Sequence, residues 1–280
     1  MARKLLFCEL GPAAYAISLQ KQILTRKIKN FFSHERFSGK RSDTQLPAVI
    51  HSYSCSLIKR GPGIDPALQE GKAHNIEVAC KRMDGIVVRP GETFSFWHLV
   101  GKTSRNNGFL PGRVLRGGRL VSGLGGGLCN LANTLHILAM HSPLTVTELH
   151  HHSDALAPDP GGVRVPYSAG TSVSYNYLDL RFRNDTDQPV QFIVRRNGDE
   201  LTAELRAEAP FPFSYRIVEE GHRFVREANG NVYRLGRIYR EIYDAATGKL
   251  LKRELKRDNR SRVMFDPALL PPGSISGPEN

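Results

Sequence analysis

A cysteine that closely follows three consecutive glycines is the most informative chemical feature of the sequence. Only Leu128 separates Cys129 from the glycine run 125–127. Apolar residues recur at helical spacing over 128–140, so the pattern predicts a helix with Cys129 in its first turn. A helix N-terminus carries free N–H groups and partial positive charge, which favour a thiolate over a thiol. The placement therefore predicts either an activated nucleophile or a small buried cysteine at the start of a packed helix.

Three consecutive histidines further along the chain offer a base for this thiol. His150 and His152 have i, i+2 spacing on a predicted strand over 145–152, so both side chains point to one face. One of them could take the thiol proton, and Asp179 on a later strand could orient its imidazole. The order Cys, His, Asp predicts a papain- or transglutaminase-like layout, with the first amides of the helix as oxyanion donors. Solvated histidines at a polar strand end would give the same pattern.

The same side chains also allow a metal site. Cys129, His150 and His152 are residue types that hold Zn²⁺, and zinc is the only cofactor we consider. None of the four cysteines has a partner at C-x-x-C spacing, so no second zinc motif is present. We expect the substrate to be held by the glycine turn, by two asparagines of the helix and by an arginine of the preceding hairpin. These residues are Gly125, Gly126, Gly127, Asn130, Asn133 and Arg113.

The elements that must position these residues are mostly short strands with few helices. Alternating apolar and polar segments between turn signals predict an α+β fold with a mainly antiparallel sheet. Residues 1–44 read as a basic helical segment and linker, with the helix over 12–32. The central domain spans 45–208, and 209–280 form a basic extension predicted as a β-meander.

The predicted N-terminal helix is amphipathic and basic. Its apolar positions are Ile17, Ile23, Leu24, Ile28 and Phe31. Such a stripe more often docks on the protein's own body, and we expect that here. The alternative is that it lies on an anionic membrane surface, because lysines and an arginine are interleaved with the apolar residues.

Composition narrows the classes of partner. The 280 residues carry a formal net charge of +12, which suits an anionic partner or simply a well-solvated basic surface. No helix-turn-helix, zinc-finger or RNP pattern is present, so no specific nucleic-acid partner is expected. The N-terminus lacks a continuous apolar h-region, and no apolar stretch reaches the roughly 18 residues of a spanning helix. We therefore expect a cytoplasmic protein, membrane-peripheral in the alternative above.

Four motifs in order resemble the VanW family. They are PGETFSFWHLVG over 90–101, GRLVSGLGGGLCNLANTLH over 118–136, the His-x-His-Ser strand end, and SVSYNYLDLRFRNDTDQPV over 172–190. The resemblance covers roughly 45–208. It departs from many relatives at Asn130, where they have Gln, and at 170–173, where they have Asp-Ala-Thr-Val.

The resemblance implies a bacterial cell-envelope or glycopeptide-resistance context, and it brings no established reaction with it. Combined with the residues above, it leads to two hypotheses. The first is a cysteine-dependent amide hydrolase or acyl transferase that acts on a peptidoglycan-type peptide or precursor. The second is a non-catalytic module that binds such precursors or a partner of a resistance complex, in which the thiol of Cys129 would be unactivated and out of reach of His150.

Overall fold

The central sheet of the protein has four antiparallel strands. The computed structural model describes residues 6–60, 64–116, 119–155, 158–159 and 170–277. The strands of this sheet, in spatial order, are β1 (Ala48–Ser56), β10 (Glu200–Ala207), β9 (Val190–Asn197) and β2 (Ile86–Val88). A two-residue turn with Gly198 at a φ of 60° joins β9 to β10, as the Asn-Gly signal in the sequence predicts.

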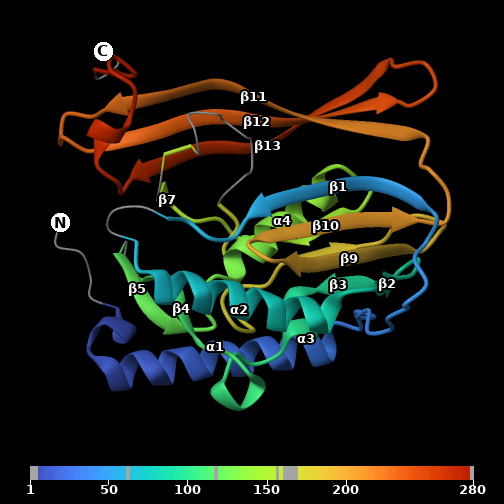
Figure 1. The fold of residues 1–280 in the computed structure, drawn as a ribbon, viewed down its shortest axis with the longest axis horizontal. Helices are drawn as coiled ribbons and strands as arrows, with labels where there is room; N and C mark the ends of the chain where they lie inside the picture. The colour runs from blue at the N-terminus through green and yellow to red at the C-terminus, as the bar shows by residue number, and fades with distance from the viewer. Residues whose placement is uncertain (1–5, 61–63, 117–118, 156–157, 160–169, 278–280) are drawn as a thin grey trace.

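Two smaller sheets lie beside the central one (Figure 1). The first contains β3 (Thr93–Ser95), β8 (Arg181–Arg183) and β6 (Thr145–Glu148), all antiparallel. The second is a hairpin of β4 (Pro111–Arg116) and β5 (Arg119–Leu124). The turn predicted at residues 117–118 of this hairpin lies outside the described residues.

The described residues also form four α-helices. They are α1 (Pro12–Phe32), α2 (Pro66–Met83), α3 (Phe96–Val100) and α4 (Leu128–Met140). Short 3₁₀ helices are η1 (Phe7–Glu9), η2 (Arg105–Asn107) and η4 (Pro267–Leu269). Asp65 caps the N-terminus of α2, because its carboxylate accepts from the free backbone N–H groups of Ala67 and Leu68, and Pro66 is the first residue of the helix.

The main core forms where α2 and α4 pack on each other and on the central sheet. Fully buried side chains in it include Ile76 and Met83 of α2, Leu131 and Leu135 of α4, and Phe192 of β9. Burial of an apolar side chain of this size stabilises a fold by about 1.5–3 kcal/mol. This core therefore fixes the position of α4, and with it the position of Cys129.

The C-terminal region is an antiparallel meander that runs along one long side of the molecule (Figure 1). Its long strands are β11 (Phe213–Arg226), β12 (Val232–Asp244) and β13 (Leu250–Val263), with β14 (Ile275–Ser276) and β7 (Asp154–Ala155) added in parallel at its edges. Ile238 of β12 packs on Ile137 and Met140 of α4, so the meander is attached to the helix that carries Cys129.

The expectation of a mixed α+β fold with mostly antiparallel sheets is confirmed. The boundaries near residues 45 and 208 stay predictions. The prediction that the apolar stripe of the N-terminal helix docks on the protein is wrong, because no residue of α1 is buried and most of the stripe is exposed. Among the residues that the structure describes, no helix is both long and apolar enough to cross a membrane.

Candidate functional site

Cys129 is the second residue of α4, and its thiol faces the backbone of a neighbouring segment. The Sγ atom lies 3.6 Å from the carbonyl oxygen of Val173, and the Val173 N–H lies 3.5 Å from the sulfur. Burial raises the pKa of the Cys129 thiol above its usual range, and this effect outweighs the hydrogen bond from Val173. The thiol is therefore held in its neutral form, the state opposite to that of an activated nucleophile.

The structure does not bring the predicted histidines or Asp179 to this thiol. His150 Nε2 lies 2.9 Å from Glu148 Oε1 instead. His152 lies four residues after the end of β6, and its backbone N–H donates to the Gly170 carbonyl at 2.7 Å. Burial lowers the pKa of its imidazole.

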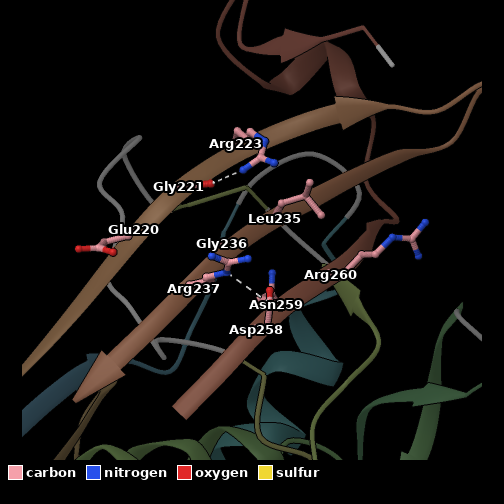
Figure 2. Close-up of a pocket in the computed structure, with 9 residues that line it drawn as sticks. All are labelled: Glu220, Gly221, Arg223, Leu235, Gly236, Arg237, Asp258, Asn259 and Arg260. Atoms are coloured by element: carbon pink, nitrogen blue, oxygen red, sulfur yellow. Dashed lines mark hydrogen bonds and ion pairs between the residues drawn. The ribbon is translucent and has the colours of Figure 1, made fainter. Parts of the chain in front are cut away.

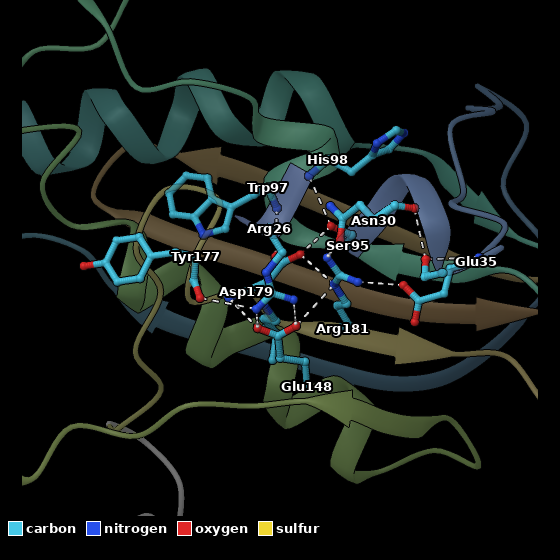
Figure 3. Close-up of polar contacts among 12 residues, drawn as sticks. Arg26, Asn30, Glu35, Ser95, Trp97, His98, Glu148, Tyr177, Asp179 and Arg181 are labelled. Carbon is cyan, nitrogen blue, oxygen red and sulfur yellow. Dashed lines mark hydrogen bonds and ion pairs between the residues drawn. The ribbon is translucent and has the colours of Figure 1, made fainter. Parts of the chain in front are cut away.

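Asp179 is buried and fully engaged by the residues around α3. Its carboxylate accepts from Ser95 Oγ at 2.6 Å, from the Trp97 N–H at 3.0 Å and from the Leu180 N–H at 2.9 Å. Arg181 Nε donates a further hydrogen bond at 2.9 Å. Its contacts join the start of α3 to β8, so in this structure Asp179 stabilises the fold rather than orienting a histidine (Figure 3).

Glu148 extends this buried network towards the N-terminal helix. It receives two hydrogen bonds from Arg26, at 2.5 and 2.6 Å, and one from the backbone N–H of Asp179 at 3.0 Å. Burial acts to raise the pKa of Glu148, but the hydrogen bonds from His150 and Arg26 lower it below its usual value. Figure 3 shows that Arg181 also reaches the residues at the end of α1, through Glu35 at 2.6 Å.

The glycine turn before α4 is packed directly against α2 and β4. A Cβ atom at Gly126 would lie 2.3 Å from the carbonyl carbon of Gly112, and one at Gly71 would lie 1.9 Å from the Pro111 oxygen. Glycine is therefore required at both positions. Asn75 of α2 is fully buried and donates from Nδ2 to the carbonyls of Gly126 and Leu110, at 2.9 Å each.

A lysine stem passes against the same turn. A Cβ atom at Gly127, whose φ is 100°, would lie 2.3 Å from Cγ of Lys72. Lys72 is only 8% exposed, and its Nζ donates to the Leu57 carbonyl at 2.7 Å. The ammonium has three N–H donors, and among the described residues only the Leu57 carbonyl accepts a hydrogen bond from it.

Two further cations gather around Lys72. Lys59 follows Leu57 by two residues, and its backbone N–H donates to Gln69 of α2 at 3.3 Å. Arg113 of β4 is half-buried next to the turn. Burial, and then repulsion from Lys59 and Arg113, lowers the pKa of Lys72 to about 8. Within the described part of the chain, no carboxylate forms an ion pair with any of the three cations.

The predicted asparagines divide between this cluster and the core. Asn130 Oδ1 lies 3.6 Å from Cys55 Sγ, on the side of the turn where Lys72 lies. Asn133 is buried and accepts from the Thr171 hydroxyl at 3.1 Å. Asn130 thus lies near the cationic cluster to which Arg113 belongs, whereas Asn133 ties α4 to the segment before Val173.

Lys72 and Asn75 are absent from the residues predicted from the sequence. Both lie on the face of α2 that also carries Ala73 and Ile76, so they interrupt an apolar stripe. A polar residue inside such a stripe is the signal that would have identified them, because burying an amide or an ammonium is costly without a partner.

Two other places were candidates for a functional site: a metal centre at the predicted ligands and a hollow on the β11–β13 meander. In the described ranges, no group of three His, Cys, Asp or Glu side chains is arranged to hold a metal ion, so the zinc alternative at Cys129, His150 and His152 gains no support. The hollow lies over a bulge in β11, and its charges are satisfied locally (Figure 2). Arg237 pairs with Asp258 at 3.4 Å, and Arg260 pairs with Glu227.

Comparisons with known proteins agree with the resemblance seen in the sequence. A family model described as VanW like protein matches residues 71–206. The vancomycin B-type resistance protein VanW of Enterococcus faecalis is 28% identical over 240 residues, which cover 84% of this chain and 86% of that protein. The YoaR protein of Bacillus subtilis is 31% identical over 136 residues, which cover 49% of this chain and 43% of YoaR. No solved structure matches the chain.

The matched region contains Lys72, Asn75, Arg113, the glycine turn and Cys129, whereas Lys59 lies before it. The order of the four motifs, the family match and the long alignment with the enterococcal protein lead to one conclusion. The chain is a VanW-like protein.

Proposed function

We propose that this chain is a non-catalytic binding module that recognises a carboxylate-bearing peptide of a cell-wall precursor. The enterococcal relative is named for vancomycin B-type resistance, and we extend that glycopeptide-resistance context to this protein. The cations Lys59, Lys72 and Arg113 would hold the carboxylate. The glycine turn and Asn130 would lie along the peptide.

The observation that carries this proposal is the unpaired cationic cluster next to the glycine turn. A buried cation without a carboxylate partner destabilises a fold, so its presence calls for an anionic ligand. The ammonium of Lys72 has two N–H donors left for such a ligand. The planar guanidinium of Arg113 can donate two parallel hydrogen bonds to a carboxylate. A bound carboxylate would relieve the repulsion among the three cations.

The state of Cys129 supports binding over catalysis. Its neutral thiol faces the Val173 backbone, and one of the two predicted bases, His150, is engaged by Glu148. A nucleophile needs a base within hydrogen-bond reach, or a lowered thiol pKa. In this arrangement Cys129 contributes packing and a weak hydrogen bond.

Calorimetric titration with a synthetic stem peptide tests the proposal. The peptide with a free C-terminal carboxylate should bind the protein, and its C-terminal amide should bind at least tenfold more weakly. Lys72→Met should reduce the difference between the two peptides, because one of the three cations that hold the carboxylate is removed. Lys81→Met is the matched control, because Lys81 lies on the same helix but is exposed and paired with Glu77. Equal binding of acid and amide by the unchanged protein would refute carboxylate recognition.

A second candidate function, a cysteine-dependent amide hydrolase or acyl transferase, is favoured by one observation. Cys129 lies in the first turn of a helix, where backbone N–H groups could stabilise an oxyanion. Its test is the pH dependence of alkylation of Cys129, with the other three cysteines replaced. A thiolate that persists below a pH of about 8.5 and disappears in His150→Ala or His152→Ala would establish this function over binding.

A further inference from the structure

The outward face of α1 is apolar although nothing in the described structure covers it. The exposed residues Ile17, Leu24, Ile28 and Phe31 share one face, since their spacings of seven, four and three residues follow helical turns. Each is at least half exposed, and Phe31 is 80% exposed. Clustered exposed apolar residues of this kind mark a contact surface in soluble proteins.

The opposite face of the helix holds it on the protein. Leu19, Ile23, Arg26 and Asn30 are partly buried and share this face, at spacings of four, three and four residues. Arg26 forms the paired hydrogen bonds to Glu148, and Asn30 Oδ1 accepts from Arg181 Nη2 at 2.7 Å (Figure 3). These polar contacts set the rotation of α1, so the apolar stripe is directed away from the body.

The charges on α1 identify the partner. No Asp or Glu occurs in residues 12–32. Lys21 and Lys27 flank the apolar stripe, one on each side, and both are exposed. A basic amphipathic helix with Phe, Leu and Ile on one face is the pattern that binds an anionic lipid surface. Packing against the same face of a second copy would bring the lysines of both copies together, so self-association is disfavoured.

We propose that α1 is a membrane-docking element that lays Ile17, Leu24, Ile28 and Phe31 on an anionic lipid surface. Figure 1 shows the helix along the outer edge of the molecule, on the side away from β11, β12 and β13. Leu6, Phe7 and Leu10, just before the helix, are also exposed and would add apolar contact at its N-terminal end.

Vesicle co-sedimentation of the full chain tests the proposal. The protein should bind vesicles of phosphatidylcholine with phosphatidylglycerol at least tenfold more tightly than vesicles of phosphatidylcholine alone. Raising the salt concentration should weaken the binding, because the lysines act through screened charge. No binding to the anionic vesicles, or equal binding to both kinds, would overturn the proposal.

Variants separate the apolar and the electrostatic parts. The triple substitution Ile17→Gln, Leu24→Gln and Phe31→Gln should reduce binding at least tenfold. Lys21→Gln with Lys27→Gln should reduce it about 25-fold, at about fivefold per lysine. Matched controls on exposed sites elsewhere, Leu250→Gln with Leu251→Gln and Leu255→Gln, should bind like the unchanged protein.

Two measurements keep the outcome unambiguous. Fluorescence of the single, buried Trp97 shows whether each variant is folded. In a separate Phe31→Trp variant, the added emission should shift to the blue with anionic vesicles, since the side chain would enter the lipid interface. Unchanged emission would overturn the proposal, as would sedimentation equilibrium showing a dimer that the triple substitution converts to a monomer.

Discussion

Replacement of Lys72 by methionine should stabilise the protein near neutral pH while removing the proposed carboxylate contact. Methionine keeps much of the apolar stem that packs on Gly127 and removes the charge. In the folded protein the pKa of Lys72 is lowered from 10.5 to about 8, first by burial and then by Lys59 and Arg113. At about 1.36 kcal/mol per pKa unit, the buried cation costs roughly 3 kcal/mol at pH 7.

The pH dependence has a definite sign. Between about pH 8 and 10.5 the unfolded chain binds a proton at Lys72 and the folded chain does not, so the stability of the wild type rises with pH over this window. The free-energy cost of burying the Lys72 cation is fully present below pH 8 and has fallen to about 1 kcal/mol by pH 10. In Lys72→Met, loss of the hydrogen bond to the Leu57 carbonyl reduces the gain in stability by about 1–3 kcal/mol at every pH.

The difference in unfolding free energy between Lys72→Met and the wild type therefore tests the argument most directly. The unfolding free energy that Lys72→Met gains over the wild type should be about 2–3 kcal/mol smaller at pH 10 than at pH 7. Urea unfolding followed by Trp97 fluorescence at both pH values measures it. The control Lys81→Met, exposed on the same helix, should show a pH-independent difference below about 0.5 kcal/mol. A pH-independent difference for Lys72→Met as well would refute the account of a desolvated cation.

Three further predictions concern the same site and its supports. Gly126→Ala should destabilise the protein by more than about 2 kcal/mol in urea unfolding, because its Cβ would meet the backbone of Gly112 at 2.3 Å. Asp179→Ala should cost about 3–5 kcal/mol in the same assay, because it leaves the buried donors of Ser95, Trp97 and Arg181 Nε without the carboxylate that accepts from them. Affinity for the free-acid stem peptide should fall about tenfold between pH 7 and pH 9 in calorimetry, since Lys72 loses its proton around pH 8.

Each of these three predictions has a control variant or a result that would contradict it. Gly39→Ala should be near neutral, because nothing lies within 4 Å of its Cβ position, and an equal loss at Gly39 and Gly126 would remove the steric argument. Asp199→Ala breaks an exposed pair with Arg60 and should cost less than about 1 kcal/mol. Peptide affinity that stays constant from pH 7 to 9 would mean that Lys72 does not bind the carboxylate.

Local spacing made parts of this protein predictable from its sequence. The apolar repeat over 128–140 predicts α4 and places Cys129 in its first turn, because helix periodicity is a property of adjacent residues. The Asn-Gly signal at Gly198 predicts a hairpin for the same reason. The sequence also contains the family motifs, the net charge of +12 and the amphipathic character of the N-terminal helix.

Only the tertiary structure decided what these side chains contact. The thiol of Cys129 meets Val173, 44 residues away, and Asp179 meets Ser95, 84 residues away, so the predicted triad is not assembled. Lys72 and Arg113 come together because α2 packs on β4 through glycines that allow close approach. Long-range packing also chose the rotation of α1, since Arg26 bonds Glu148 and leaves the apolar stripe outside. Contacts of this kind depend on which elements share a core, and local sequence patterns do not encode that choice.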